Sequence, residues 1–114
     1  MTMLNKATRL AWLLDYMLSR HKAISFMTFN VLDQDFVDSY VEATKAPSQF
    51  MLWGADRCPQ LGKDLSYLHK QCVLMRVRTG IQGLAGQGFP KWVWSYRLTD
   101  SAEAYRLTQK AKEQ

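Results

Sequence analysis

The sequence predicts an α+β fold that is mainly helical, with three helices, a C-terminal β-hairpin and one extra helix after the hairpin. Three segments that precede residue 72 repeat apolar residues at helical spacing. Two later segments alternate in side-chain character and flank a loop with four of the six glycines. The 114 residues are 47% apolar and 22% charged, which is typical of one globular domain, 1–114, with its own core.

The first helix is expected over residues 5–22, with Asn5 as its N-cap. Its apolar positions share one face: Leu10, Leu13, Leu14, Met17 and Leu18. Arg9, Asp15 and Arg20 are expected to face away from the core. Residues 23–28 are short, apolar and partly β-branched, and are expected to form a brief strand.

The second helix is expected over residues 32–45, since Pro47 prevents it from continuing. Its first half is acidic, which the helix dipole favours, and its apolar stripe is Leu32, Phe36, Val37, Tyr40 and Val41. The segment 46–59 holds four apolar residues at 50–53. It is expected to pack on the core as an irregular turn or a short extra helix.

The third helix is expected over residues 60–71, with Pro59 in its first turn. Its core stripe is Leu61, Leu65, Leu68 and Cys72, and the opposite pole carries Lys63, Ser66, Tyr67 and Lys70. Tyr67 is expected to be an exposed aromatic residue beside two lysines.

Strands are expected at 73–79 and 92–98, joined by the glycine-rich loop, and a last helix is expected at about 101–112 with Asp100 and Glu103 as a capping box. Arg76 and Arg78 share one strand face, and Arg97 is expected to join them across the hairpin. Lys91 stands at the far end of the loop. The aromatic residues Phe89, Trp92 and Trp94 are expected to pack in the core rather than stack on bases.

The net charge of +5 is concentrated in residues 60–98. That segment holds six basic residues and one acidic residue, whereas residues 1–58 hold six of each. A cationic patch of this kind is a natural partner for a polyanion such as nucleic acid.

The order helix, short strand, helix, turn, helix, strand, glycine-rich loop and strand resembles the winged helix-turn-helix family. The residues that carry the resemblance are KDLSYLHKQCVLMRVR at 63–78 and WSYRLT at 94–99, and the similarity covers about residues 5–99. GFPKWVWSY and YRLT also look like small regulators of bacteriophages and prophages. One departure is the segment of about fourteen residues before the third helix, where the family has three or four.

The resemblance implies a DNA-binding protein that regulates transcription or replication of a phage or mobile element. It implies that helix 60–71 lies in the major groove of double-stranded DNA. Lys63, Ser66, Tyr67 and Lys70 would then reach base edges or phosphates. The hairpin 73–98 would contact phosphates through Arg76, Arg78, Lys91 and Arg97. The sequence leaves open whether the protein forms a homodimer.

An alternative is a winged-helix module for protein–protein contact, such as an adaptor or an inhibitor of a host factor. It would use the acidic helix 32–45 and the apolar segment 50–53. The salt dependence of binding separates the two hypotheses. Affinity at a cationic DNA interface falls steeply as the salt concentration rises, whereas affinity at an apolar protein interface should not.

Other classes have little support from the sequence. No catalytic residues are expected, because His21 and His69 have no nucleophile or carboxylate at a telling spacing. No metal is expected, because a helix over 60–71 would hold Cys58 and Cys72 roughly 18–20 Å apart. No cofactor is expected, because the glycine loop lacks the GK[ST] end of a P-loop. No apolar stretch approaches the roughly 18 residues that span a bilayer, so a cytoplasmic protein is expected.

Overall fold

The computed structural model describes residues 2–23, 28–50, 56–80 and 92–113. The helices are α1 (Lys6–Ala23), α2 (Gln34–Thr44), α3 (Pro59–Lys70) and α4 (Ala102–Glu113), and the strands are β1 (Gln49–Phe50), β2 (Asp56–Arg57), β3 (Leu74–Gly80) and β4 (Trp92–Leu98). The expectation of a mainly helical α+β fold with a C-terminal hairpin and an extra helix is confirmed.

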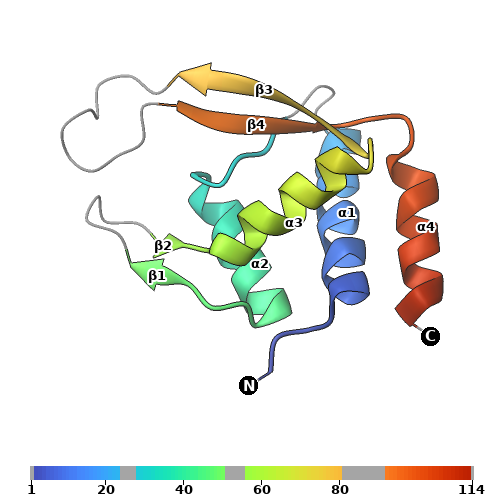
Figure 1. Ribbon diagram of the computed structural model, residues 1–114, viewed down its shortest axis with the longest axis horizontal. Coiled ribbons are helices and arrows are strands. Elements are labelled where there is room, and N and C mark those ends of the chain that lie inside the picture. Colours follow the sequence, from blue (N-terminus) through green and yellow to red (C-terminus); the bar gives the residue numbers. More distant parts are fainter. Residues whose placement is uncertain (1, 24–27, 51–55, 81–91, 114) are drawn as a thin grey trace.

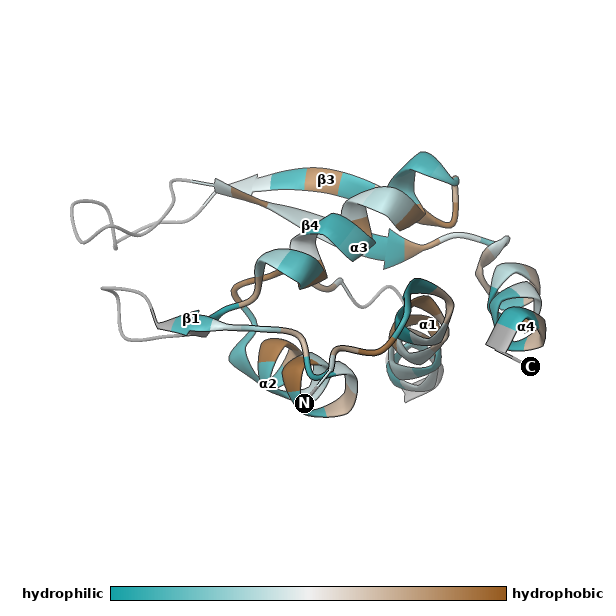
Figure 2. Cartoon of the chain, turned by 60° about the horizontal axis from the view of Figure 1, so that its bottom comes forward, coloured by the Kyte–Doolittle hydropathy of each residue, from teal (hydrophilic) through white to brown (hydrophobic). Residues whose placement is uncertain are grey.

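The β3–β4 hairpin lies across the top of the molecule in Figure 1, and α3 runs obliquely beneath it. Helix α4 lies beside α1 in both cartoon views (Figures 1 and 2). The core is filled from every helix and from the start of the hairpin. Its largest buried side chains are Tyr40, Phe29, Phe36, Leu10, Leu13, Leu14, Met17, Leu61, Leu65, Leu68 and Leu74.

Both N-terminal helices begin at side-chain caps, of which the sequence predicted the first. The Thr8 amide donates to Asn5 Oδ1 at 2.9 Å, which confirms Asn5 as a cap of α1. Helix α2 starts at Gln34 rather than residue 32, because Asp33 is its N-cap and accepts hydrogen bonds from the amides of Asp35 and Phe36. One of the acidic residues of this region therefore has a structural role.

The segment between α2 and α3 holds a second small hairpin. Gln49 pairs with Arg57 and Phe50 with Asp56, so the expectation of an irregular turn or short helix is wrong where the structure describes this segment. The apolar residues 51–53 lie outside the described residues. Most of the strand expected at 23–28 also lies outside them, and residue 23 belongs to α1.

Phe29, just beyond that segment, forms an antiparallel bridge with Tyr96 of β4. The two residues exchange backbone hydrogen bonds of 2.8 and 2.7 Å. The extended chain before α2 is thus tied to the hairpin.

Helix α3 buries Leu61, Leu65 and Leu68 as expected, but Cys72 is exposed. The helix ends before Cys72, which has a left-handed backbone with φ of 62°. The Cys72 amide donates to the carbonyl of His69, and the Val73 amide to that of Leu68. This is a Schellman motif, and it turns the Cys72 side chain away from the apolar stripe.

In the β3–β4 hairpin, Arg76 lies opposite Tyr96 and Arg78 opposite Trp94, whereas Arg97 lies opposite Met75. Residues directly opposite in an antiparallel pair share a face. Arg76 and Arg78 therefore share one face, but Arg97 is on the other. The expectation that all three arginines line one face is wrong. The alternation along β3 appears as brown and teal bands in Figure 2.

Helix α4 begins at hydrogen bonds that Thr99, and not Asp100, accepts. The Ser101 amide donates to Thr99 Oγ1 and the Ala102 amide to the Thr99 carbonyl. Helix α4 then contacts α1 through ion pairs of Arg106 and Lys110 with Asp15, at 2.8 and 3.1 Å. Asp15 thus faces α4 across the helix pair.

Candidate nucleic-acid interface

An open groove of about 640 Å³ runs along the outer side of α3. Its lining is Lys6, Arg9, Arg57, Pro59, Gln60, Gly62, Lys63, Asp64, Ser66, Tyr67 and Lys70. Five of these residues are basic and one is acidic. The groove is therefore cationic, and it is bordered by three of the chain's segments.

Three of the α3 residues singled out in the sequence lie where they were expected. Lys63 and Lys70 are exposed, and Ser66 is partly exposed beside them. Within the described part of the chain, neither lysine makes an ion pair with an acid. Both ammonium groups are available to an anion in the groove.

Lys6 and Arg57 join these lysines in the groove, and sequence reasoning missed them. Both belong to the half of the chain with zero net charge. Lys6 opens α1, and Arg57 ends β2 two residues before α3. No periodic pattern connects them with α3, so only the fold brings them together.

Tyr67 is half-buried rather than exposed, which corrects the expectation from the sequence. The Nζ of Lys6 lies 3.4 Å from the centroid of its ring, in a cation–π contact. Burial, together with a side-chain hydrogen bond with Tyr67, raises the pKa of Tyr105 to about 12. Tyr67 thus holds Lys6 at the groove and links α3 to α4.

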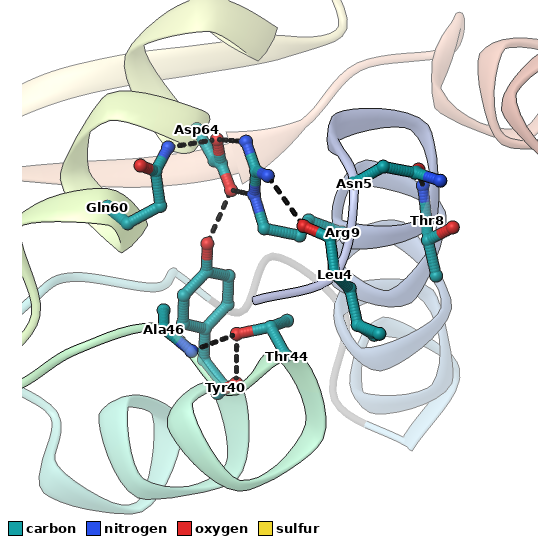
Figure 3. A network of polar contacts seen from close by, with 9 residues as sticks. All are labelled: Leu4, Asn5, Thr8, Arg9, Tyr40, Thr44, Ala46, Gln60 and Asp64. Atoms are coloured by element: carbon teal, nitrogen blue, oxygen red, sulfur yellow. Dashed lines mark hydrogen bonds and ion pairs between the residues drawn. The ribbon is translucent and has the colours of Figure 1, made fainter. Parts of the chain in front are cut away.

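Among the described residues of the groove, the one acid is Asp64, which is buried and has several hydrogen-bond donors around its carboxylate (Figure 3). It receives hydrogen bonds from Arg9 Nε at 3.0 Å, Arg9 Nη2 at 3.3 Å and Gln60 Nε2 at 3.0 Å. The Tyr40 hydroxyl donates to the same carboxylate. Arg9 was expected to face away from the core, but it is only 7% exposed, because this ion pair draws it inward.

This cluster connects three helices through one carboxylate. Arg9 belongs to α1, Tyr40 to α2 and Asp64 to α3. A buried charge with several directional partners tolerates little rotation of the helix that carries it. Asp64 thus fixes how α3 is turned. Because Arg9 balances the charge of Asp64, this carboxylate does not offset the exposed cations of the groove.

The same cluster makes the ionisation of Tyr40 unfavourable. Burial raises the pKa of Tyr40 well above its ordinary value of 10.0, and the hydrogen bond to Asp64 raises it further. The pKa of Arg9 is also raised, chiefly by its hydrogen bonds to Asp64. Both residues therefore keep their protons in the folded protein under strongly alkaline conditions.

We expect stability to fall as pH rises above 10, the ordinary pKa of tyrosine. Above that value the unfolded chain has released protons that folded Tyr40 and Tyr105 still hold, so raising the pH favours unfolding. Urea unfolding at pH 8, 9, 10 and 11 measures this. In Tyr40→Phe the decline over the same range should be smaller, and an equal decline would show that Tyr40 contributes nothing to it.

The hairpin brings a second set of cations together with aromatic rings. The guanidinium carbon of Arg76 lies 4.2 Å from the ring centroid of Trp94, and that of Arg78 lies 4.4 Å from that of Trp92. Trp94 packs partly on the core, whereas Trp92 is 37% exposed. The expectation that both indoles are core residues is therefore wrong for Trp92.

Of the remaining candidates from the sequence, the structure describes Arg97 and does not bring it to these sites. Arg97 lies on the other hairpin face, where its Nη2 is 3.9 Å from Met75 Sδ. It borders a separate groove that includes His21 and Glu103. Lys91 and Phe89 lie outside the described residues.

Comparison with protein-family models, with curated proteins and with solved structures found no match to this chain. The geometry itself is therefore the basis for any functional inference. In the described ranges, no three or more His, Cys, Asp or Glu residues are grouped so as to hold a metal ion. None of the helices in those ranges combines the length and the apolar content that a bilayer-spanning helix needs.

Proposed function

We propose that this chain is a winged-helix DNA-binding protein whose partner is double-stranded DNA. The element order supports the proposal: three helices precede a long hairpin, and the bridge of Phe29 with Tyr96 occupies the place of the family's short strand. The small β1–β2 hairpin is an insertion between the second and third helices. In this proposal, α3 is the recognition helix and β3–β4 is the wing.

The observation that carries the proposal is the cationic groove on α3. Lys6, Arg57, Lys63 and Lys70 converge there from three segments, and Asp64, the one acid among the described residues that line the groove, is already paired with Arg9. Solvated lysines on a helix face are common, but convergence of cations from distant segments into one groove is the electrostatic footprint of a polyanion site.

Each group has a role that fits its position. Lys63 and Lys70 are exposed on the groove side of α3, about two turns apart, where they can reach guanine edges or phosphates. Ser66, between them, is a permissive hydrogen-bonding residue. Lys6, Arg57, Arg76 and Arg78 are suited to phosphates, which position the protein without reading sequence. A regulatory role in a phage or mobile element rests on the resemblance described above.

Fluorescence anisotropy with a mixed pool of labelled duplexes, at 50–300 mM salt, tests this proposal. Each phosphate contact contributes about 0.9 to the dependence of log K on log salt. If most of the six cations named above touch phosphate, the slope should lie between about −3 and −5.

A slope near zero, or no binding to any duplex at low salt, would contradict the proposal. Polyglutamate of matched charge is the control for unspecific attraction, and it should bind more weakly than duplex DNA. Equal binding would show that the groove recognises charge alone.

A further inference from the structure

The exposed end of the hairpin carries two cations and two indoles in an interlocked row. Trp92 and Trp94 are edge-to-face, with ring centroids 5.1 Å apart. Arg76 stacks on Trp94 and Arg78 on Trp92. The register places all four side chains on one hairpin face. We name this set, Arg76, Arg78, Trp92 and Trp94, the Arg–Trp row.

An indole stacked on a guanidinium contacts its flat face and leaves the N–H donors at its edge uncovered. The N–H groups of arginine lie in the guanidinium plane, so a ring above or below that plane leaves them free to donate. Among the residues that the structure describes, Arg76 and Arg78 make no hydrogen bond or ion pair with an acid. Their donor edges therefore have no acceptor among the described residues and are open to one from outside the chain.

The row therefore fits the backbone of a nucleic acid better than its bases. In each pair, the guanidinium covers a ring face that a base would otherwise stack on. Phosphate oxygens match the fork of N–H donors on each arginine. Two like charges two positions apart on one strand repel, and an anion between them relieves that repulsion.

We propose that Trp92 and Trp94 are positioning residues that hold Arg78 and Arg76 for contact with DNA phosphates. This inference rests on the proposed function. A free arginine loses rotamer freedom when it binds, and the indoles restrict that freedom beforehand. Each indole therefore raises affinity by holding its arginine, and it does not add a phosphate contact of its own.

Trp92→Leu and Arg78→Ala, alone and together, test the inference. Both sites are exposed at the hairpin end, so folding should survive, as circular dichroism checks. Arg78→Ala should make the salt slope shallower by about 0.9. Trp92→Leu should weaken duplex binding about three- to tenfold, as expected for one cation–π contact and one freed side chain, with the salt slope unchanged.

The double variant gives the decisive comparison. In the Arg78→Ala background, Trp92→Leu should have no further effect on affinity. In the wild-type background, Trp92→Tyr keeps an aromatic face under Arg78, so its affinity should stay near the wild-type value. Val77→Thr is the control on the other hairpin face, where Val77 is 59% exposed, and it should leave affinity unchanged.

An equal loss of affinity from Trp92→Leu in the presence and in the absence of Arg78 would overturn the inference while leaving DNA binding intact. A loss of affinity in Val77→Thr as large as that in Trp92→Leu would do the same. Absence of duplex binding by the wild-type protein would overturn the proposed function and this inference together. The two failures are therefore distinguishable.

Discussion

Asp64→Asn is expected to lower the free energy of unfolding by about 3–5 kcal/mol, the range observed when one partner of a buried ion pair is removed. Asp64 is 2% exposed, and all of its partners in the cluster are donors: Arg9, Tyr40 and Gln60. An asparagine amide group would turn its own donors toward them and leave Arg9 without a counter-charge. Urea unfolding monitored by circular dichroism measures the change.

Glu42→Gln is the matched control, because Glu42 is an exposed acid on α2. It should alter stability by less than about 0.5 kcal/mol. If Asp64→Asn had an effect as small as Glu42→Gln, the cluster would not hold the helices together.

A second pair of variants separates the ion pair from simple packing. Arg9→Met should also be strongly destabilising, because it leaves the carboxylate of Asp64 buried without its cation. The double variant Arg9→Met, Asp64→Leu should lose clearly less stability than the sum of the losses in the single variants Arg9→Met and Asp64→Leu. Additive losses would mean that the two charges do not depend on each other.

The largest expected effect on binding is that of Lys63→Ala, Lys70→Ala. If both lysines contact phosphates, the salt slope should become shallower by about 1.8 and affinity near 0.1 M salt should fall by roughly 10- to 100-fold. Folding should be unaffected, because both side chains are exposed on the face opposite Leu61, Leu65 and Leu68. Anisotropy titrations with duplex DNA measure both quantities.

Lys45→Ala, Lys112→Ala removes the same charge from exposed sites outside the groove. This control should weaken binding only slightly, through the lower net charge. Equal losses in the two double variants would show that charge alone, and not the groove on α3, determines affinity.

The apolar periodicity of the sequence was sufficient to predict the first three helices, because each must bury one face, whereas the fourth was predicted from Asp100 and Glu103. Leu13, Phe36 and Leu65 are buried where that spacing puts them. The alternation in 92–98 likewise predicted β4. Helix ends were less predictable, since the Schellman motif that exposes Cys72 uses a left-handed residue that is usually glycine.

The parts of the candidate site that were missed depend on contacts between distant residues. Arg9 and Asp64 are 55 positions apart, and the pattern of its own helix predicted that Arg9 faces away from the core. The face of Arg97 depends on the hairpin register, which a long glycine-rich loop does not specify. Charge summed along the chain hid Lys6 and Arg57, because the six acidic residues of 1–58 cancel the six basic ones in that sum.

The most direct measurement is a titration of ¹⁵N-labelled protein with short duplex DNA, followed by amide chemical shifts. If α3 and the hairpin bind DNA, the largest changes should map to residues 62–70, to Lys6 and Arg57, and to residues 76–78 of β3. The acidic residues of α2 and the exposed side of α4 should change little. Changes confined to α2, or no changes at saturating duplex, would contradict the assignment of the α3 groove as a DNA-binding site.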